Sequence, residues 1–191
     1  MIKSWIRGKQ QILNEGFGKT FIRQTLQNPY IEQEEEFFLI GQPDWAIILP
    51  VTLDKEVITV RQYKAGCNQI INELPAGIKN YPTETWEETA TRELLEETGY
   101  SGQFRSLGSC WMASGCSFTQ FHCFLAENCY KLSEQKLDAN ERIEIVLFSV
   151  QEWLDQIFRG IIQESSSIVT TCRALPYLQR SFVDDYAKEE Q

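Results

Sequence analysis

The chain has 191 residues, of which 42% are hydrophobic and 24% charged, so it is long enough to bury one sizeable core. Its formal net charge of −9 excludes a broad nucleic-acid surface, because binding to a phosphate backbone requires clustered Lys and Arg. An acidic protein that handles phosphates needs metal cations between its own charges and those of the ligand.

Cysteine and histidine usage predicts neither a zinc site nor disulfides. The six cysteines form no CxxC pair, and His122 is the only histidine. The first ten residues carry basic side chains with no apolar run after them, so we expect neither a secretory signal nor a membrane span. These features favour a cytoplasmic protein with free thiols.

The first 42 residues are expected to form a small β appendage. Residues 19–26 and 37–40 have the β-branched and aromatic composition of strands, and Asn28-Pro29 marks a turn between them. The acidic run at residues 32–36 is expected to be a solvated turn.

Residues 43–191 are expected to form the main domain, an α/β sandwich around a mixed sheet. Apolar and β-branched runs predict strands at residues 45–52, 56–63, 70–74, 107–112, 120–126 and 144–150. Helices are predicted from residue 85 to 98, from 152 to 159, and from 166 to 180 with a kink at Pro176.

The first of these helices has boundary signals at both ends. Thr85 and Glu88 have the spacing of a capping box, in which each residue binds the backbone N–H of the other. The residues up to Thr98 are mostly good helix formers, and Gly99 supplies the stop.

Three glutamates on this helix, Glu93, Glu96 and Glu97, stand at i, i+3 and i+4, so their carboxylates can meet at one cation. A run of charges is more often a solvated helix face. Here, however, Glu93 and Glu97 fall in the same arc as Ala90 and Leu94, the face expected to pack on the sheet. The pattern favours Mg²⁺ or Mn²⁺, because a divalent ion offsets the repulsion between these carboxylates and binds phosphate oxygens.

The stretch around this helix resembles the signature of the Nudix hydrolase family. Between the first glycine and the first glutamate there are six residues where the usual pattern has five, whereas the helix keeps its usual register. The segments at residues 60–64 and 73–77, and Gly160 before a Ser-rich helix start, resemble the ADP-ribose pyrophosphatase branch. The matching signature positions are Gly77, Glu84, Arg92, Glu93, Leu94, Glu96, Glu97, Gly99 and Tyr100.

The resemblance implies roles for these residues. Glu93 and Glu97 would be the principal metal ligands and catalytic groups, Glu96 a further ligand or a partner, and the Ala76 carbonyl a backbone ligand. Four residues would support the site, by ion pairing or by backbone geometry: Gly77, Glu84, Arg92 and Gly99. In this branch the catalytic base comes from a loop before the last strand of the sheet, and Glu141 is preferred over Glu144, which is expected to lie in the strand already.

Three further residues are candidates for substrate binding. Arg61 and Lys64, near the end of a predicted strand, would contact phosphates, although a basic pair beside acidic residues is also ordinary surface chemistry. Gly115 lies in a segment that resembles a substrate-side loop. In that loop Ser114 replaces a proline and Thr119 replaces an acid, which leaves the substrate open.

The resemblance thus implies metal-dependent cleavage of the pyrophosphate of a small nucleoside diphosphate derivative, with ADP-ribose converted to AMP and ribose 5-phosphate as the leading reaction. The alternatives are a nucleotide sugar, a dinucleoside polyphosphate, or a module that binds a nucleotide without hydrolysing it. It also implies a homodimer in which the appendage crosses to the partner. No nucleic-acid or membrane partner is expected.

Overall fold

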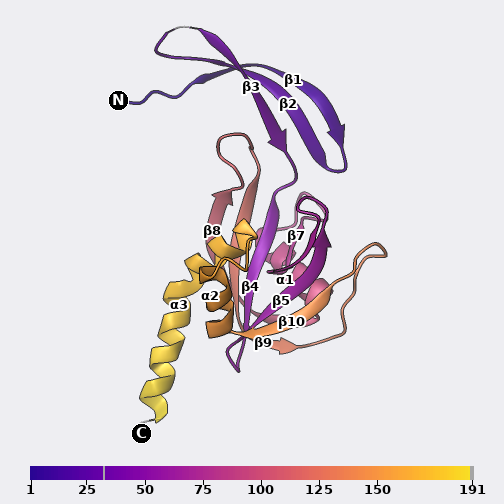
Figure 1. Cartoon of the computed structure of the whole chain (residues 1–191), viewed down its shortest axis with the longest axis vertical. Helices are drawn as coiled ribbons and strands as arrows, with labels where there is room; N and C mark the ends of the chain where they lie inside the picture. The colour runs from indigo at the N-terminus through magenta and orange to yellow at the C-terminus, as the bar shows by residue number, and fades with distance from the viewer. Residues whose placement is uncertain (32, 190–191) are drawn as a thin grey trace. The chain divides into compact units, whose positions relative to one another are not determined.

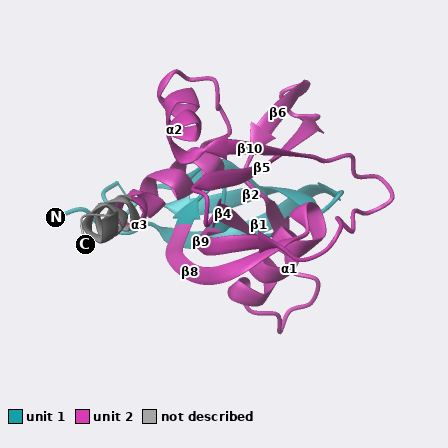
Figure 2. Cartoon of the chain, turned by 90° about the horizontal axis from the view of Figure 1, so that it is seen from below, with its two compact units in different colours: residues 1–44, 110–121 teal, residues 45–109, 122–191 magenta. Residues whose placement is uncertain are grey.

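The structure of the chain is a computed structural model that describes residues 1–31 and 33–189 (Figure 1). It has two compact units, which Figure 2 shows in different colours: residues 1–44 with 110–121, and residues 45–109 with those from 122 onward. The division into an appendage at residues 1–42 and a main domain at residues 43–191 stays a prediction.

The first unit contains a three-stranded antiparallel sheet in the order β1-β2-β3, formed by β1 (Ile6–Gly16), β2 (Lys19–Gln27) and β3 (Glu34–Gly41). The two predicted strands are therefore confirmed. Phe17 and Gly18 both have positive φ, 51° and 70°, as a two-residue hairpin turn between β1 and β2 requires.

Two expectations for this unit were wrong. The acidic run was expected to be a turn, but β3 begins at Glu34, so its last three glutamates are strand residues, while Glu32 lies outside the described residues. The backbone of these glutamates pairs with β2, and this pairing supplies the hydrogen bonds that make the acidic segment a strand. β1 was not predicted, because its residues are mostly polar and exposed along the whole strand.

The main sheet has strands in the order β10-β5-β4-β9-β8, and apart from residues 110–111 of β8 and 120–121 of β9 these strands belong to the second unit. These are β4 (Trp45–Thr52), β5 (Glu56–Lys64), β8 (Tyr100–Trp111), β9 (Gln120–Lys131) and β10 (Glu144–Ser149). In addition, β6 (Gln69–Glu73) pairs with β5 and β7 (Ala76–Ile78) pairs with β4. The predicted strands are present, β8 and β9 are longer than expected, and β7 was not predicted.

Among the residues described, three helices complete the unit: α1 (Trp86–Thr98), α2 (Val150–Phe158) and α3 (Ser165–Glu189). The predicted helix starts agree with the structure to within two residues, but α3 runs past Pro176 and past the predicted end at residue 180. The expected α/β fold around a central mixed sheet is confirmed. None of the helices in the described ranges combines the length and hydropathy needed to cross a membrane.

The core of this unit lies where α1 packs on the sheet. Ile48 of β4 and Ile58 of β5 are fully buried together with Ala90 and Leu94 of α1. One face of α1 is therefore fixed against the sheet, and this packing decides which of its glutamates point inward.

Candidate active site

Local contacts set the ends of α1 as the sequence predicts. The Thr85 hydroxyl accepts a hydrogen bond from the Glu88 N–H at 3.2 Å, and the Glu88 carboxylate accepts one from the Thr85 N–H at 2.7 Å. Gly99 ends the helix with φ at 72° and donates its N–H to the Leu95 carbonyl at 2.8 Å. The predicted capping box and glycine stop are confirmed.

The inner face of α1 carries a buried carboxylate. Glu97 is only 6% exposed, and its Oε2 accepts a hydrogen bond from the Ala76 N–H at 3.0 Å. Burial and, next, the charge of Glu93 raise the pKa of Glu97 to about 8. Burial likewise raises the pKa of Glu93. Burial thus disfavours the ionised forms of both carboxylates, and a cation bound between them would offset this cost.

Arg92 joins the glutamates of the helix to one another. Its Nη1 donates to Glu93 at 2.8 Å and to Glu96 at 2.9 Å, and its Nε donates to Glu84 at 2.9 Å. Its Nη2 donates to the Ile78 carbonyl at 2.7 Å, which ties the guanidinium to the end of β7. Arg92 holds the pKa of Glu84 below its usual range.

The short strand β7, which precedes α1 in the chain, comes very close to these carboxylates. A Cβ placed on Gly77 would overlap the Glu93 carboxylate, so glycine alone allows β7 to pass at this distance. Ala76, next to it, holds Glu97 through its N–H. The oxygens available here, two carboxylates and the backbone carbonyls of β7, are the donors that Mg²⁺ and Mn²⁺ take, so the residues fit a divalent cation.

Glu96 does not turn toward the other two carboxylates, as the expectation of three glutamates at one cation requires. It pairs with Arg92, and 40% of its side chain is exposed. The residues that the structure describes contain no group of three or more His, Cys, Asp or Glu placed to hold one metal ion. The geometry thus offers Glu93 and Glu97 as a pair, and the assignment of Glu96 as a ligand stays a prediction.

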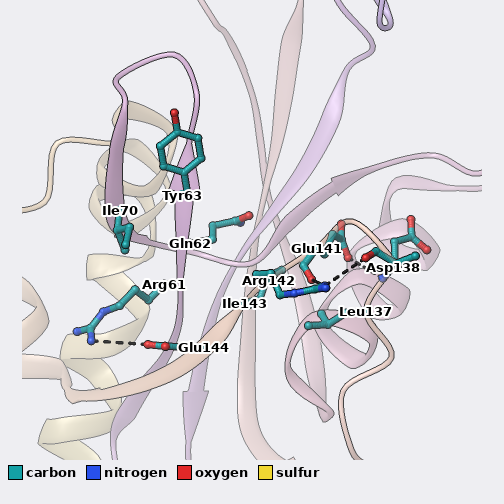
Figure 3. Close-up of a pocket in the computed structure, with 11 residues that line it drawn as sticks. Arg61, Gln62, Tyr63, Ile70, Leu137, Asp138, Glu141, Arg142, Ile143 and Glu144 are labelled. Atoms are coloured by element: carbon teal, nitrogen blue, oxygen red, sulfur yellow. Dashed lines mark hydrogen bonds and ion pairs between the residues drawn. The ribbon is translucent and has the colours of Figure 1, made fainter.

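A pocket of about 1050 Å³ opens between the β5–β6 hairpin and the loop before β10 (Figure 3). Glu141, in the loop before β10, lines it and accepts a hydrogen bond from the Asp138 N–H at 3.0 Å. Its charge is among the causes that raise the pKa of Glu93, which relates the loop to the α1 carboxylates. The remaining lining comes from the β5–β6 hairpin, the same loop and the first residue of β10: Arg61, Gln62, Tyr63, Ile70, Leu137, Asp138, Ala139, Arg142, Ile143 and Glu144.

The other candidate residues lie in three different settings. Arg61 lines the pocket, where it donates to Asn72 at 2.9 Å and faces Glu144, the first residue of β10, at 3.9 Å. Lys64 is paired with Glu73 at 2.6 Å. Gly115 belongs to the first unit and has open space around its Cα, so its substrate role stays a prediction.

Sequence reasoning missed a buried acid beside the site. Glu73, at the end of β6, is 7% exposed and accepts hydrogen bonds from Gln62 at 2.7 Å and from Lys64. Its charge is one of the causes that raise the pKa of Glu97. The available signal was a single acid at the end of an apolar strand, directly before Leu74-Pro75.

Comparison with known proteins identifies the family. The family model described as NUDIX domain matches residues 42–164. The chain belongs to the Nudix family. Over 143 residues it is 30% identical to a Bacillus subtilis protein named ADP-ribose pyrophosphatase, a match that covers 74% of this chain and 75% of that protein. It is 29% identical, over the same length and with the same coverage, to a Bacillus methanolicus protein named methanol dehydrogenase activator.

A solved structure supports the fold of this Nudix hydrolase. A crystal structure titled as an ADP compounds hydrolase superposes with a TM-score of 0.81 and covers 95% of this chain and 97% of the other. At 18% sequence identity, this likeness concerns the fold alone.

In this Nudix hydrolase the loop with one additional residue closes on Glu84, whose Oε2 accepts the Asn80 N–H at 2.7 Å.

Proposed function

We propose that this Nudix hydrolase cleaves the pyrophosphate bond of a nucleoside diphosphate derivative with the help of a divalent cation, and that ADP-ribose, giving AMP and ribose 5-phosphate, is its leading substrate. The observation that carries the proposal is the carboxylate pair on the inner face of α1, in which Glu97 is buried and the Glu93 side chain is 14% exposed.

The cation is proposed to be Mg²⁺, with Mn²⁺ as the alternative. Glu93 and Glu97 would hold it, with the Ala76 carbonyl as a backbone ligand and Glu96 as a further ligand or partner. When bound, such an ion lowers the pKa of a water molecule and neutralises charge that develops on phosphate oxygens. Arg92 keeps Glu93 in place through its contact of 2.8 Å.

Glu141 is proposed as the general base that accepts the proton of the attacking water. Glu141 lines the pocket from a loop, so a small movement of the loop can bring its carboxylate to the water. Glu144 is less suited, because it is fixed in β10 and points to Arg61. Arg61 and Gly115 are proposed to contact the substrate, and Lys64 would do so only after leaving Glu73.

ADP-ribose is preferred as substrate because of the relative from Bacillus subtilis and because residues 60–64 and 73–77 resemble that branch. Ser114 and Thr119, which depart from the pattern of the branch, favour keeping nucleotide sugars and dinucleoside polyphosphates as alternatives. These alternatives share the bond that is broken and differ in the group attached to it.

The experiment is a substrate panel. Purified protein is incubated with ADP-ribose, ADP-glucose, GDP-mannose and diadenosine polyphosphates, with Mg²⁺, with Mn²⁺ and with a chelator, and the products are resolved. AMP released chiefly from ADP-ribose and only with metal is the expected result. A preference for another compound would change the assigned substrate and keep the hydrolytic activity. Absence of hydrolysis for every compound would contradict the proposal.

A homodimer and a cytoplasmic setting complete the proposal. Phe21, Phe38 and Ile40 of the three-stranded sheet are between 39% and 51% exposed, an apolar surface of the kind that partner chains cover. None of the six cysteines, all of which lie in the described part of the chain, forms a disulfide, as a reducing compartment would keep them.

A further inference from the structure

The segment that holds Glu97 is itself held by a helix from the far end of the chain. Leu74 is 1% exposed, and its backbone N–H donates to the Ser167 hydroxyl of α3 at 3.0 Å. The two residues are 93 positions apart in the sequence. Because Leu74 comes two residues before Ala76, this bond acts directly on the segment that positions the carboxylate.

Ser167 is fixed in one orientation. It is fully buried, and its hydroxyl donates to the Glu164 carboxylate at 2.8 Å, which leaves its oxygen free to accept from Leu74. The same carboxylate oxygen accepts the Ser167 N–H at 2.7 Å. Glu164 thereby accepts hydrogen bonds from backbone N–H groups in the first turn of α3, and it orients the Ser167 hydroxyl so that its oxygen points to the Leu74 N–H.

The next backbone groups of the segment are bound one after another. The Pro75 carbonyl accepts the Ile48 N–H of β4 at 3.0 Å, and the Ala76 N–H donates to Glu97 at 3.0 Å. The segment from Leu74 to Ala76 is thus anchored by α3 on one side and by β4 on the other, and its remaining N–H orients the buried carboxylate.

We propose that Ser167, aimed by Glu164, is a positioning residue for the hydrolysis: it fixes the segment so that Ala76 holds Glu97 in the geometry that binds the cation. This inference rests on the proposed function, since the cation is part of it. Partners that orient metal ligands from outside commonly change metal affinity by roughly 10- to 100-fold when they are lost.

The test compares Ser167→Ala with Ser166→Ala. Ser166 is its neighbour, is buried to a similar degree and binds the same Glu164, but makes its contacts within the helix start. Mn²⁺ binding to each folded protein without substrate is measured by calorimetry, and kcat and KM for ADP-ribose are measured separately. We expect Ser167→Ala to weaken Mn²⁺ binding by about tenfold and to lower kcat, and Ser166→Ala to leave both near wild type.

Equal Mn²⁺ affinity in the two folded variants would overturn the positioning role while leaving the proposed function intact. Absence of Mn²⁺ binding by the wild-type protein would overturn both. If Ser167→Ala does not fold, Ser167→Cys replaces it, because a thiol fills similar space with a weaker acceptor. That variant should weaken Mn²⁺ binding in the same direction, and unchanged binding would overturn the inference.

Discussion

Arg92 makes three ion pairs within 2.9 Å, and two of them join side chains that are largely shielded from water, since Arg92 is 20%, Glu84 3% and Glu93 14% exposed. Removing one partner of such a pair leaves the other charge without compensation. At the residue scale, the site is therefore held by charge compensation, with Arg92 serving Glu84, Glu93 and Glu96 at once.

Glu84 gives this compensation a pH dependence. Its pKa is lowered by Arg92 first and then by the Asn80 N–H, so the ionised form stabilises the fold at pH values above the ordinary 4.5. This contribution is lost as the pH falls through the lowered pKa. Glu84→Gln should lower the free energy of unfolding by about 2 kcal/mol at neutral pH, and the difference from wild type should shrink as the pH falls below 4.5 and through the lowered pKa of Glu84. Urea denaturation at several pH values measures it, and a difference that stays constant would contradict it.

Glu141 and Glu144 allow a matched comparison of two acids in neighbouring positions. Glu141→Gln should lower kcat by roughly 10²- to 10⁴-fold and leave Mn²⁺ binding nearly unchanged, as loss of a general base does. Glu144→Gln breaks only the exposed pair with Arg61 and should change kcat by less than about fivefold. Steady-state kinetics on ADP-ribose decides, and the opposite ranking would make Glu144 the base.

At the scale of elements, α1 brings the carboxylates together because its start, its end and its inner face are all set locally. The capping box begins it, Gly99 ends it, and Ala90 and Leu94 fix its rotation against the sheet. A helix anchored in this way holds Glu97 at a defined depth beside the β7 segment.

Thr85→Ala should therefore destabilise the protein without changing the chemistry. Loss of an N-cap costs about 1 kcal/mol, which corresponds to a fall in Tm of about 2 to 4 °C for a chain of this size. Thr83→Ala, an exposed position just before the cap, is the control and should leave Tm unchanged. Equal Tm values for the two variants, measured by thermal unfolding, would show that the cap contributes nothing.

The same local character explains which elements could be predicted. The limits of α1 and of β4 follow from neighbouring residues, so sequence patterns alone predict them. β7 is only three residues long and exists because it pairs with β4, and β1 is polar and depends on β2 for its partner. Pairing of that kind leaves no local signal in the sequence.

At the scale of the whole molecule, the limit of sequence reasoning is long-range contact. The motif places Glu93 and Glu97 correctly on the inner face of α1, but the turn of Glu96 toward Arg92 depends on which rotamer the ion pair selects. The hydrogen bond between Leu74 and Ser167 joins segments 93 residues apart, and the sequence around neither residue predicts this contact.

The first unit supplies a prediction about assembly. Phe21 and Phe38 stack with ring centroids 5.9 Å apart on neighbouring strands, and both are exposed. If this surface joins two chains, Phe38→Glu should convert the dimer to a monomer, because a buried unpaired charge is costly. Leu53→Glu, at an exposed turn of the second unit, should leave the dimer intact. Light scattering after gel filtration measures the mass, and a wild-type monomer or a dimeric Phe38→Glu protein would contradict the prediction.

The central claim is that the buried acid of α1 binds the cation used in hydrolysis, and a pair of variants on that helix tests it most directly. Turnover of ADP-ribose with Mg²⁺ is measured for Glu97→Gln and for Glu87→Gln, which removes an exposed carboxylate from the same helix. Loss of about 4 kcal/mol of transition-state stabilisation predicts a fall in kcat of about a thousandfold for Glu97→Gln. Glu87→Gln should keep wild-type turnover, and equal turnover in the two variants would contradict the claim.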